Sequence, residues 1–217
     1  MKYLRKFATE ADVNMSVIPN VVLVEDTGKI VYNVLNGVFI QHIDGTLYTT
    51  DEWTAGGFAN DQANGVAVGE GAVKFVIAKQ DISGTKKWSS DTTTQFDGIL
   101  TTYDSNTAKK DFAGVANTAI IAATDDSGAV YSCVNYAFPN GAKGYLPGAG
   151  ELALAQSMKS KVSAAMSTIG GTSFADDFYW SSTQASGTDG IRVYMSSGYP
   201  TYNSKASAFR IRAFTTL

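Results

Sequence analysis

The side chains best suited to chemistry are few and lie apart in the sequence. Two carboxylate pairs, Asp125–Asp126 and Asp176–Asp177, could bind a cation such as calcium, but turn residues flank both pairs. A helix cap or a solvated turn explains them more simply. His42 falls within a β-type run and Cys133 on an apolar helical face, where structural roles are expected. One histidine and one cysteine cannot form a zinc cluster by themselves or an internal disulfide. We therefore predict no metal and no cofactor.

The chain carries none of the common catalytic motifs. G-x-S-x-G, the Walker A sequence and H-E-x-x-H are absent. The glycine-dense run 65–71 lacks the Lys-Ser/Thr of a phosphate loop, so we interpret it as strand and turn. The sequence thus predicts a protein that is not an enzyme. One alternative stays open, a polysaccharide-cleaving enzyme that uses a carboxylate pair such as Asp176 and Glu151.

The amino-acid composition argues against nucleic acid and membranes as partners. The chain has 217 residues, 44% of them hydrophobic and 17% charged, which is typical of a globular protein. Lys and Arg number 17 against 20 Asp and Glu, so there is no basic field for nucleic acid or an anionic membrane. No apolar run approaches the roughly 20 residues of a membrane span. Glu10 and Asp12 stand where a signal peptide needs an apolar core, which predicts a protein kept in the cytoplasm or released by lysis.

Short β-type runs separated by turns fill the first 55 residues. They are 21–24, 29–32, 38–43 and 47–50. Asp26-Thr27-Gly28 and Asp44-Gly45 lie between them, and Asp-Gly between apolar runs is a hairpin signal. Residues 1–15 suggest a short helix or an ordered arm. Because so short a module buries little surface alone, we expect residues 1–55 to attach to another subunit, another protein or the following domain.

The pattern in residues 56–217 mixes strands and helices. We predict strands at 65–68 and 74–78, and a closing strand at 208–214 from its alternating hydrophobicity. Apolar residues at helical spacing predict helices with an apolar face over 112–123 and 129–137. The clearest helix covers 151–169 and ends at Gly170-Gly171. The fold class is therefore α+β.

Three segments in the last third carry a resemblance to a known fold. They are 144–152 (GYLPGAGEL), 178–184 (FYWSSTQ) and 209–214 (FRIRAF). In this order they resemble the signatures of a bacterial and phage branch of the C-type lectin-like fold, in which G-Y-L-P precedes a helix, Y-W-S-S-T lies on a central strand and a basic strand closes the domain. Segments 65–68, 75–78, 111–114 and 117–118, with Trp88, are also similar. The resemblance covers about residues 60–217 and implies a C-type lectin-like domain at 56–217.

The resemblance also implies a binding face, because in this fold the segment between the Y-W-S-S-T strand and the closing strand presents ligand-binding loops. Tyr, Ser, Asn and Gly, which adaptable binding surfaces favour, are frequent there. Ordinary hairpin residues on a β-rich surface are the alternative. The candidate ligand-binding residues are Gln184, Ser186, Thr188, Asp189, Arg192, Tyr194, Ser196, Tyr199, Tyr202, Asn203 and Lys205.

Two members of this fold class are disfavoured by departures from their motifs. Calcium-dependent lectins use Glu-Pro-Asn or Gln-Pro-Asp, whereas the comparable tripeptide here is Phe138-Pro139-Asn140. The formylglycine-generating enzymes depend on a cysteine pair, and this chain has one cysteine. We therefore expect neither calcium-mediated sugar binding nor that enzymatic activity.

The first residues resemble the start of virion proteins from tailed phages of gut bacteria. The similar segments are 1–12 and 19–24. This resemblance implies a phage virion surface protein, such as a head fibre, a decoration protein or a tail receptor-binding component, assembled in the host cytoplasm. Residues 1–55 would contact other virion proteins or form a homo-oligomer, with a trimer favoured, while the lectin-like domain binds a host-surface glycan or protein. A purely structural capsid or tail protein and a bacterial surface adhesin remain alternatives.

Overall fold

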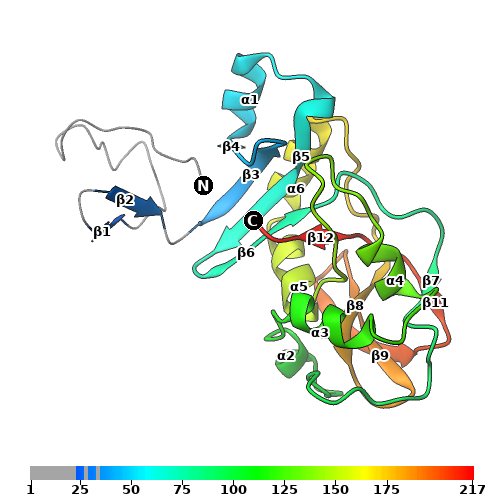
Figure 1. Ribbon diagram of the computed structural model, residues 1–217. Helices are drawn as coiled ribbons and strands as arrows, with labels where there is room; N and C mark the ends of the chain where they lie inside the picture. The colour runs from blue at the N-terminus through cyan, green and yellow to red at the C-terminus, as the bar shows by residue number, and fades with distance from the viewer. Residues whose placement is uncertain (1–22, 27–28, 33–34) are drawn as a thin grey trace.

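A five-stranded antiparallel sheet and a three-stranded antiparallel sheet organise the protein (Figure 1). The computed structural model describes residues 23–26, 29–32 and 35–217. The larger sheet has the order β12-β6-β5-β3-β4 and the smaller one β10-β9-β8, with two-stranded pairs β1-β2 and β11-β7 beside them. The strands are β1 (Leu23–Asp26), β2 (Lys29–Tyr32), β3 (Gly37–His42), β4 (Leu47–Tyr48), β5 (Ala63–Glu70), β6 (Val73–Ile77), β7 (Lys86–Lys87), β8 (Phe178–Gln184), β9 (Asp189–Tyr194), β10 (Tyr199–Ser204), β11 (Ala208–Phe209) and β12 (Phe214–Thr215).

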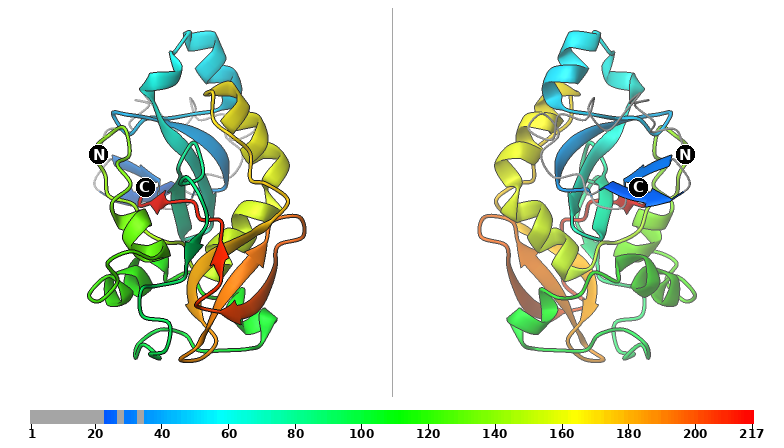
Figure 2. Two further views of the ribbon diagram at one scale, coloured as in Figure 1. Left: turned by 90° about the vertical axis from the view of Figure 1, so that its right-hand side faces the viewer. Right: turned by 90° about the vertical axis from the view of Figure 1, so that its left-hand side faces the viewer.

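Helices pack against these sheets, so the predicted α+β class is confirmed. They are α1 (Thr50–Gly56), the 3-10 turn η2 (Asn60–Gln62), α2 (Ser105–Ala108), α3 (Gly114–Ile121), α4 (Ala129–Val134), α5 (Ala149–Ser157) and α6 (Lys159–Thr168). Helix α6 packs against β3 and β5 of the large sheet, and α5 packs against the strands of the small sheet (Figure 2). Among the described residues, no helix combines the length and the apolar character that a bilayer crossing needs. The predicted helix or arm at residues 1–15 lies outside the described residues.

Both predicted N-terminal hairpins are confirmed, β1-β2 and β3-β4. The second hairpin is part of the large sheet, because β3 also pairs with β5 along its whole length. The predicted boundary near residue 55 therefore falls between two paired strands of one sheet. The division into an attachment module and a following domain stays a prediction.

The glycines of segment 65–71 are explained by close packing. A Cβ atom at Gly65 would lie 2.3 Å from the Ile77 carbonyl oxygen, and one at Gly69 would lie 2.5 Å from the Leu35 carbonyl oxygen. Residues of β5 are buried up to Gly69, so this central strand needs small residues where neighbouring backbones approach. The interpretation of this run as strand and turn is confirmed.

The long helix predicted over 151–169 is two helices. Met158 has φ −104° and ψ 17° and ends α5 where α6 begins. The predicted buried side is confirmed, since Leu152, Val162 and Met166 are fully buried. The stop is also confirmed: Gly170 has φ +66° and the Gly171 N–H donates to the Met166 carbonyl.

Helix α3 faces the opposite way from its predicted orientation. Apolar Phe112 and Val115 are 41% and 49% exposed, whereas Asn117 and Thr118 are buried. The Asn117 amide donates to Asp111 Oδ2 at 2.9 Å, and the Thr118 hydroxyl donates to the Leu146 carbonyl at 3.1 Å. Specific hydrogen bonds to buried acceptors have determined which side of the helix faces the core.

The predicted closing strand over 208–214 is two short strands that belong to different sheets. β11 pairs with β7 and β12 pairs with β6, while Ile211, Arg212 and Ala213 between them are buried without forming a strand. The alternation predicted from the sequence is therefore wrong in its middle. Arg212 is fully buried because carboxylate and carbonyl oxygens surround its guanidinium.

The three segments behind the lectin-like resemblance meet in space. Tyr145 forms an antiparallel bridge with Phe214, and Tyr179 forms a parallel bridge with Arg210. The Ser182 N–H also donates to the Pro147 carbonyl at 2.8 Å. Residues far apart in the sequence thus build one unit around β8.

Candidate functional site

The β9-β10 hairpin carries most of the predicted ligand-binding residues. In its antiparallel register Tyr199 lies opposite Tyr194, and Thr201 lies opposite Arg192. Paired residues point to the same face of a sheet and alternate residues to opposite faces. Ile191 and Val193 point into the core that contains α5 and α6. Arg192 and Tyr194 lie on the opposite face, where Trp180, opposite Arg192, is fully buried in a second hydrophobic cluster. β10 is an edge strand, and α2 packs beside it, with the Ser105 hydroxyl donating to the Pro200 carbonyl at 2.8 Å.

Two of the predicted ligand-binding residues, Gln184 and Lys205, are fully buried. The Gln184 amide donates to the Phe96 carbonyl at 2.6 Å and accepts from the Phe96 N–H at 3.1 Å. The Lys205 ammonium donates to the Thr94 carbonyl at 2.8 Å and lies 4.3 Å from the centre of the Trp88 ring. Both side chains hold the loop around residues 88–102 against the small sheet, so we do not include them in the exposed face.

Three further candidates lie at the hairpin turns. Thr188 and Ser196 are exposed, and Ser186 is half-buried. The Ser186 hydroxyl donates to Asp189 Oδ2 at 3.1 Å, which organises the turn between β8 and β9. Ser196 in the next turn offers its carbonyl to the Gln156 amide at 3.1 Å. These residues shape the ends of the hairpin and are accessible there.

An exposed tyrosine group lies along the edge strand, and we call it the tyrosine edge: Tyr103, Asp189, Tyr199 and Tyr202. The three tyrosines are 54%, 55% and 51% exposed. The Tyr103 and Tyr202 rings meet edge to face at 4.7 Å, and the Tyr103 hydroxyl donates to Asp189 Oδ2 at 3.1 Å. Lys109 Nζ lies 5.8 Å from the centre of the Tyr199 ring. Sequence reasoning missed Tyr103 because it lies about 80 residues before the predicted segment, with no local signal of its position.

A second group lies on the outward face of the small sheet, and we call it the guanidinium face: Phe178, Arg192, Tyr194, Thr201, Asn203 and Phe209. All six residues are partly exposed. The Phe178 and Tyr194 rings stack at 4.8 Å with 29° between their planes. The Arg192 guanidinium carbon lies 3.8 Å from the centre of the Phe178 ring and 4.3 Å from that of Phe209. Phe178, Thr201 and Phe209 were not predicted, although their strands were.

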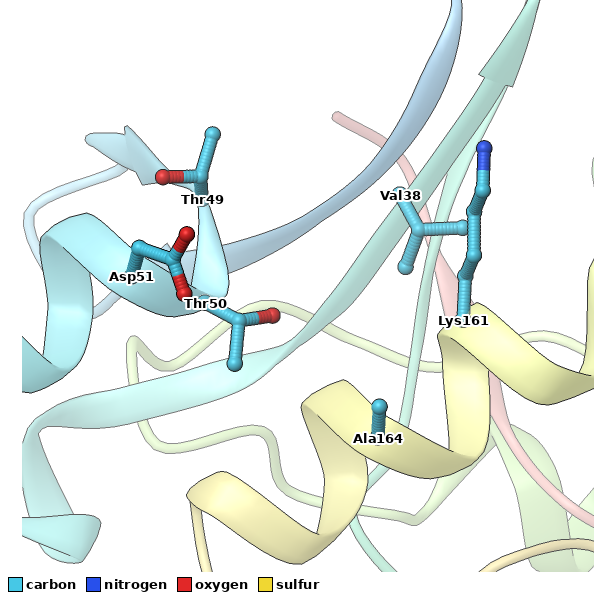
Figure 3. A pocket seen from close by; sticks show the side chains of 6 residues that line it. All are labelled: Val38, Thr49, Thr50, Asp51, Lys161 and Ala164. Carbon is cyan, nitrogen blue, oxygen red and sulfur yellow. The ribbon is translucent and has the colours of Figure 1, made fainter.

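A groove of about 250 Å³ lies elsewhere, between α1, β3 and α6 (Figure 3). Its lining residues are Val38, Thr49, Thr50, Asp51, Lys161 and Ala164. Thr49 caps α1, since its hydroxyl accepts from the Glu52 N–H at 3.2 Å. Nothing in the lining suggests a specific ligand.

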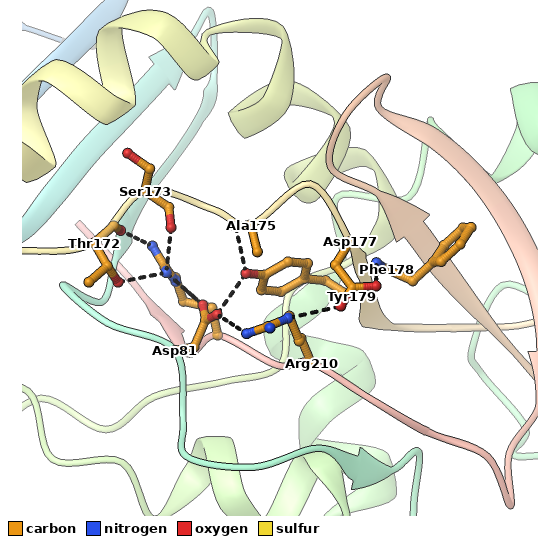
Figure 4. Close-up of polar contacts among 9 residues, drawn as sticks. Asp81, Thr172, Ser173, Ala175, Asp177, Phe178, Tyr179 and Arg210 are labelled. Atoms are coloured by element: carbon orange, nitrogen blue, oxygen red, sulfur yellow. Dashed lines mark hydrogen bonds and ion pairs between the residues drawn. The ribbon is translucent and has the colours of Figure 1, made fainter.

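The conspicuous charged network around Asp81 is structural (Figure 4). Asp81 accepts from Arg212 Nε at 2.6 Å and from the Tyr179 hydroxyl at 2.7 Å. Burial, together with the hydrogen bond to Asp81, raises the pKa of Tyr179. Arg210 Nε donates to Asp177 Oδ2 at 3.0 Å. The network joins the loop after β6 to β8 and to the closing segment.

The carboxylates that could do chemistry have structural partners. Asp125 accepts from the N–H groups of Gly128 and Tyr131, at 2.9 and 2.7 Å, and so caps the start of α4. Asp176 pairs with Lys159. Buried Glu151 accepts from the Gly148 N–H at 2.6 Å and from the Tyr145 hydroxyl at 3.0 Å, and burial raises its pKa to about 8. In the part of the chain that the structure describes, no three His, Cys, Asp or Glu side chains are grouped to hold a metal ion.

His42 and Cys133 are also held in packed surroundings. The His42 ring lies 5.5 to 6.3 Å from the ring centres of Tyr48, Trp53 and Phe58. Cys133 is fully buried, and burial raises the pKa of its thiol. A buried, protonated thiol is unreactive, in agreement with its interpretation as a small core residue.

Comparison with known proteins gives a likeness of fold. No protein-family model matches the chain. No curated protein matches it either. The structure is similar to that of a fimbrial protein from Bacteroides ovatus, with 17% sequence identity and a TM-score of 0.63 over 85% of this chain. The match covers 49% of the fimbrial protein, so this chain spans about half of that protein's length.

Proposed function

We propose that the protein is a non-enzymatic phage virion surface protein, a head fibre, decoration or tail receptor-binding component, whose C-type lectin-like domain binds the host surface. One observation carries the binding role. The β9-β10 hairpin exposes aromatic and polar side chains on its edge and on its outward face, while its other face packs into the core. Half-exposed tyrosines are typical of binding surfaces, especially beside polar side chains such as Thr201 and Asn203, which make no hydrogen bond within the described residues.

The assignment to a virion rests on the resemblance of residues 1–12 and 19–24 to phage virion proteins. Residues 1–55 would dock on the particle or form a homo-oligomer, with a trimer favoured. Particles that lack the protein test this assignment. We expect them to lose host adsorption or another component of the particle, and unchanged composition with unchanged adsorption would contradict it.

Binding of the fluorescently labelled chain to a panel of gut bacterial strains tests the binding role. We expect strain-selective binding that falls at least about tenfold in the Tyr194→Ala, Tyr199→Ala, Tyr202→Ala triple variant. Tyr131→Ala is the matched control, since Tyr131 is 45% exposed on α4. Binding to no strain, or equal binding by a folded triple variant, would favour a purely structural capsid or tail protein.

A bacterial surface adhesin is a second candidate, which the fold likeness to a Bacteroides fimbrial protein favours. The two candidates differ in where the protein is found. Antibody labelling of purified phage particles and of intact cells separates them, because a virion protein labels the particle and an adhesin labels the surface of uninfected cells.

A further inference from the structure

Arg192 stands out because its guanidinium has neither a hydrogen bond nor an ion pair with any residue that the structure describes. Within those residues, its Nε atom is buried without an acceptor. A guanidinium carries five N–H donors, and a buried donor without an acceptor costs free energy. Burial accordingly lowers the pKa of Arg192. The contacts of the described residues do not compensate for the cost of leaving this donor without an acceptor.

Aromatic rings hold this guanidinium in place. Its carbon lies 3.8 Å and 4.3 Å from the ring centres of Phe178 and Phe209, and these centres are 6.2 Å apart with their planes at 63°. The guanidinium therefore lies in the corner between two rings. Contact with ring faces fixes its orientation without using its N–H groups. The Nη donors, unlike the buried Nε, thus remain available at the edge of the guanidinium.

The surrounding charges favour an anion. The carboxylate whose charge acts on Arg192, that of Asp177, already accepts from Arg210 Nε at 3.0 Å through Oδ2 and from the Phe178 N–H at 2.7 Å through Oδ1. Lys86 pairs with Phe209 across the β11-β7 ladder, which places another cation on the same side as that ring. Arg192 and Lys86 therefore give this part of the surface positive charge that no ion pair neutralises among the described residues.

The residues next to Arg192 can accommodate a sugar. Thr201 lies directly opposite Arg192 on β10, and Asn203 follows two residues later on the same face. The structure gives neither side chain a hydrogen bond within the described part of the chain. Tyr194, stacked on Phe178, adds an aromatic surface. A hydroxyl, an amide and an aromatic ring beside a guanidinium match a ring that carries hydroxyls and one carboxylate.

We propose that the guanidinium face binds an acidic sugar, with the carboxylate on Arg192 and the sugar ring over Tyr194, Thr201 and Asn203. This inference rests on the proposed host-binding function and names its ligand class, a glycan that contains uronic or similar carboxylated residues. Arg192 is the specificity-determining residue, because a neutral sugar would leave its donors unpaired.

NMR of the 15N-labelled full chain tests the inference through the arginine Nε–Hε signals. The signal of Arg192 is assigned by its loss in Arg192→Gln. We expect sodium glucuronate to shift this signal with a dissociation constant of about 1–10 mM, and glucose to leave it unchanged. The Arg192 variants lack this signal, so their binding is followed by the backbone amide signals of Thr201 and Asn203, which lie beside Arg192. Arg192→Lys should weaken binding about tenfold, since it loses the planar fork. Lys161→Gln, which removes one exposed positive charge near α1, should bind as the unmodified chain does.

Two results would overturn the inference: a signal that glucuronate does not move, or equal binding by Arg192→Gln. The bacterial binding assay separates this failure from failure of the proposed function. If Arg192→Gln still binds host strains selectively, the ligand class is wrong and host binding stands. If glucuronate shifts the Arg192 signal but the chain binds no strain, the acidic-sugar site stands and the proposed host-binding role fails.

Discussion

Glu151 gives the protein a pH dependence at the scale of one residue. Burial, with a smaller contribution from the charge of nearby Asp111, raises its pKa from an ordinary value of 4.5 to about 8, against the hydrogen bonds from Gly148 and Tyr145, which lower it. The folded protein therefore keeps a proton that the unfolded chain releases above pH 4.5. Stability should fall as pH rises from about 5 to 8, by at most about 1.4 kcal/mol per pH unit.

Urea unfolding at pH 5, 6.5 and 8 measures this dependence. Glu151→Gln keeps the shape of the side chain and cannot ionise, so its unfolding free energy should change less over the same range. An equally steep decline in the variant would show that another group is responsible.

Lys205 illustrates what sequence reasoning at the residue scale misses. It was predicted to bind ligand, yet its ammonium donates to the Thr94 carbonyl and lies over the Trp88 ring. Those partners come from a loop about 110 residues earlier, and no local pattern shows that this loop covers the end of β10. The composition of the hairpin could be predicted, but the side chains that the loop buries could not.

We expect Lys205→Ala to destabilise the fold by about 2–3 kcal/mol, because it removes the hydrogen bond to the Thr94 carbonyl and opens space beside the buried Trp88 ring. Lys87→Ala, at an exposed position, should change stability by less than about 0.5 kcal/mol. Chemical denaturation followed by tryptophan fluorescence compares the two variants. Similar small effects would mean that the ammonium contributes little to holding the loop.

At the scale of the element, α3 shows that hydrogen bonds can outweigh periodicity. We expect Asn117→Ala to cost about 2 kcal/mol, because the buried carboxylate of Asp111 loses a donor at 2.9 Å. Val115→Ser on the exposed side should cost less than about 0.5 kcal/mol. Thermal unfolding ranks the two variants. If Val115→Ser lowered the unfolding temperature more than Asn117→Ala, the apolar side of α3 would be the one that faces the core.

The elements themselves were predictable where a local rule decides them. Asp44-Gly45 predicts the β3-β4 hairpin, and the run that ends at Gly170 predicts α6 because glycine tolerates the left-handed conformation there. The break at Met158 has no such signal, since the sequence around it favours helix on both sides. Segment 208–214 alternates as a strand would, but its two ends pair with different sheets through contacts that no local pattern encodes.

At the scale of the whole molecule, the position of β3 decides how much of the chain forms one folding unit. β3 lies between β4 and β5 in the large sheet, and Ile40 is fully buried in the core that also contains α6 residues such as Val162. Removal of β3 would expose β5, whose residues are buried on both faces, along a full edge. The sheet therefore requires residues 35–48.

Two truncated chains test this requirement. A chain that begins at residue 35 keeps every described contact of the large sheet and should unfold cooperatively, with a midpoint within about 5 °C of the full chain. A chain that begins at residue 57 lacks β3, β4 and α1 and should show no cooperative transition, because the exposed sheet loses more than the about 5–15 kcal/mol by which domains of this size are stable. A cooperative transition in this shorter chain would instead support a self-sufficient domain that starts near residue 56, with the preceding strands as a separate attachment module.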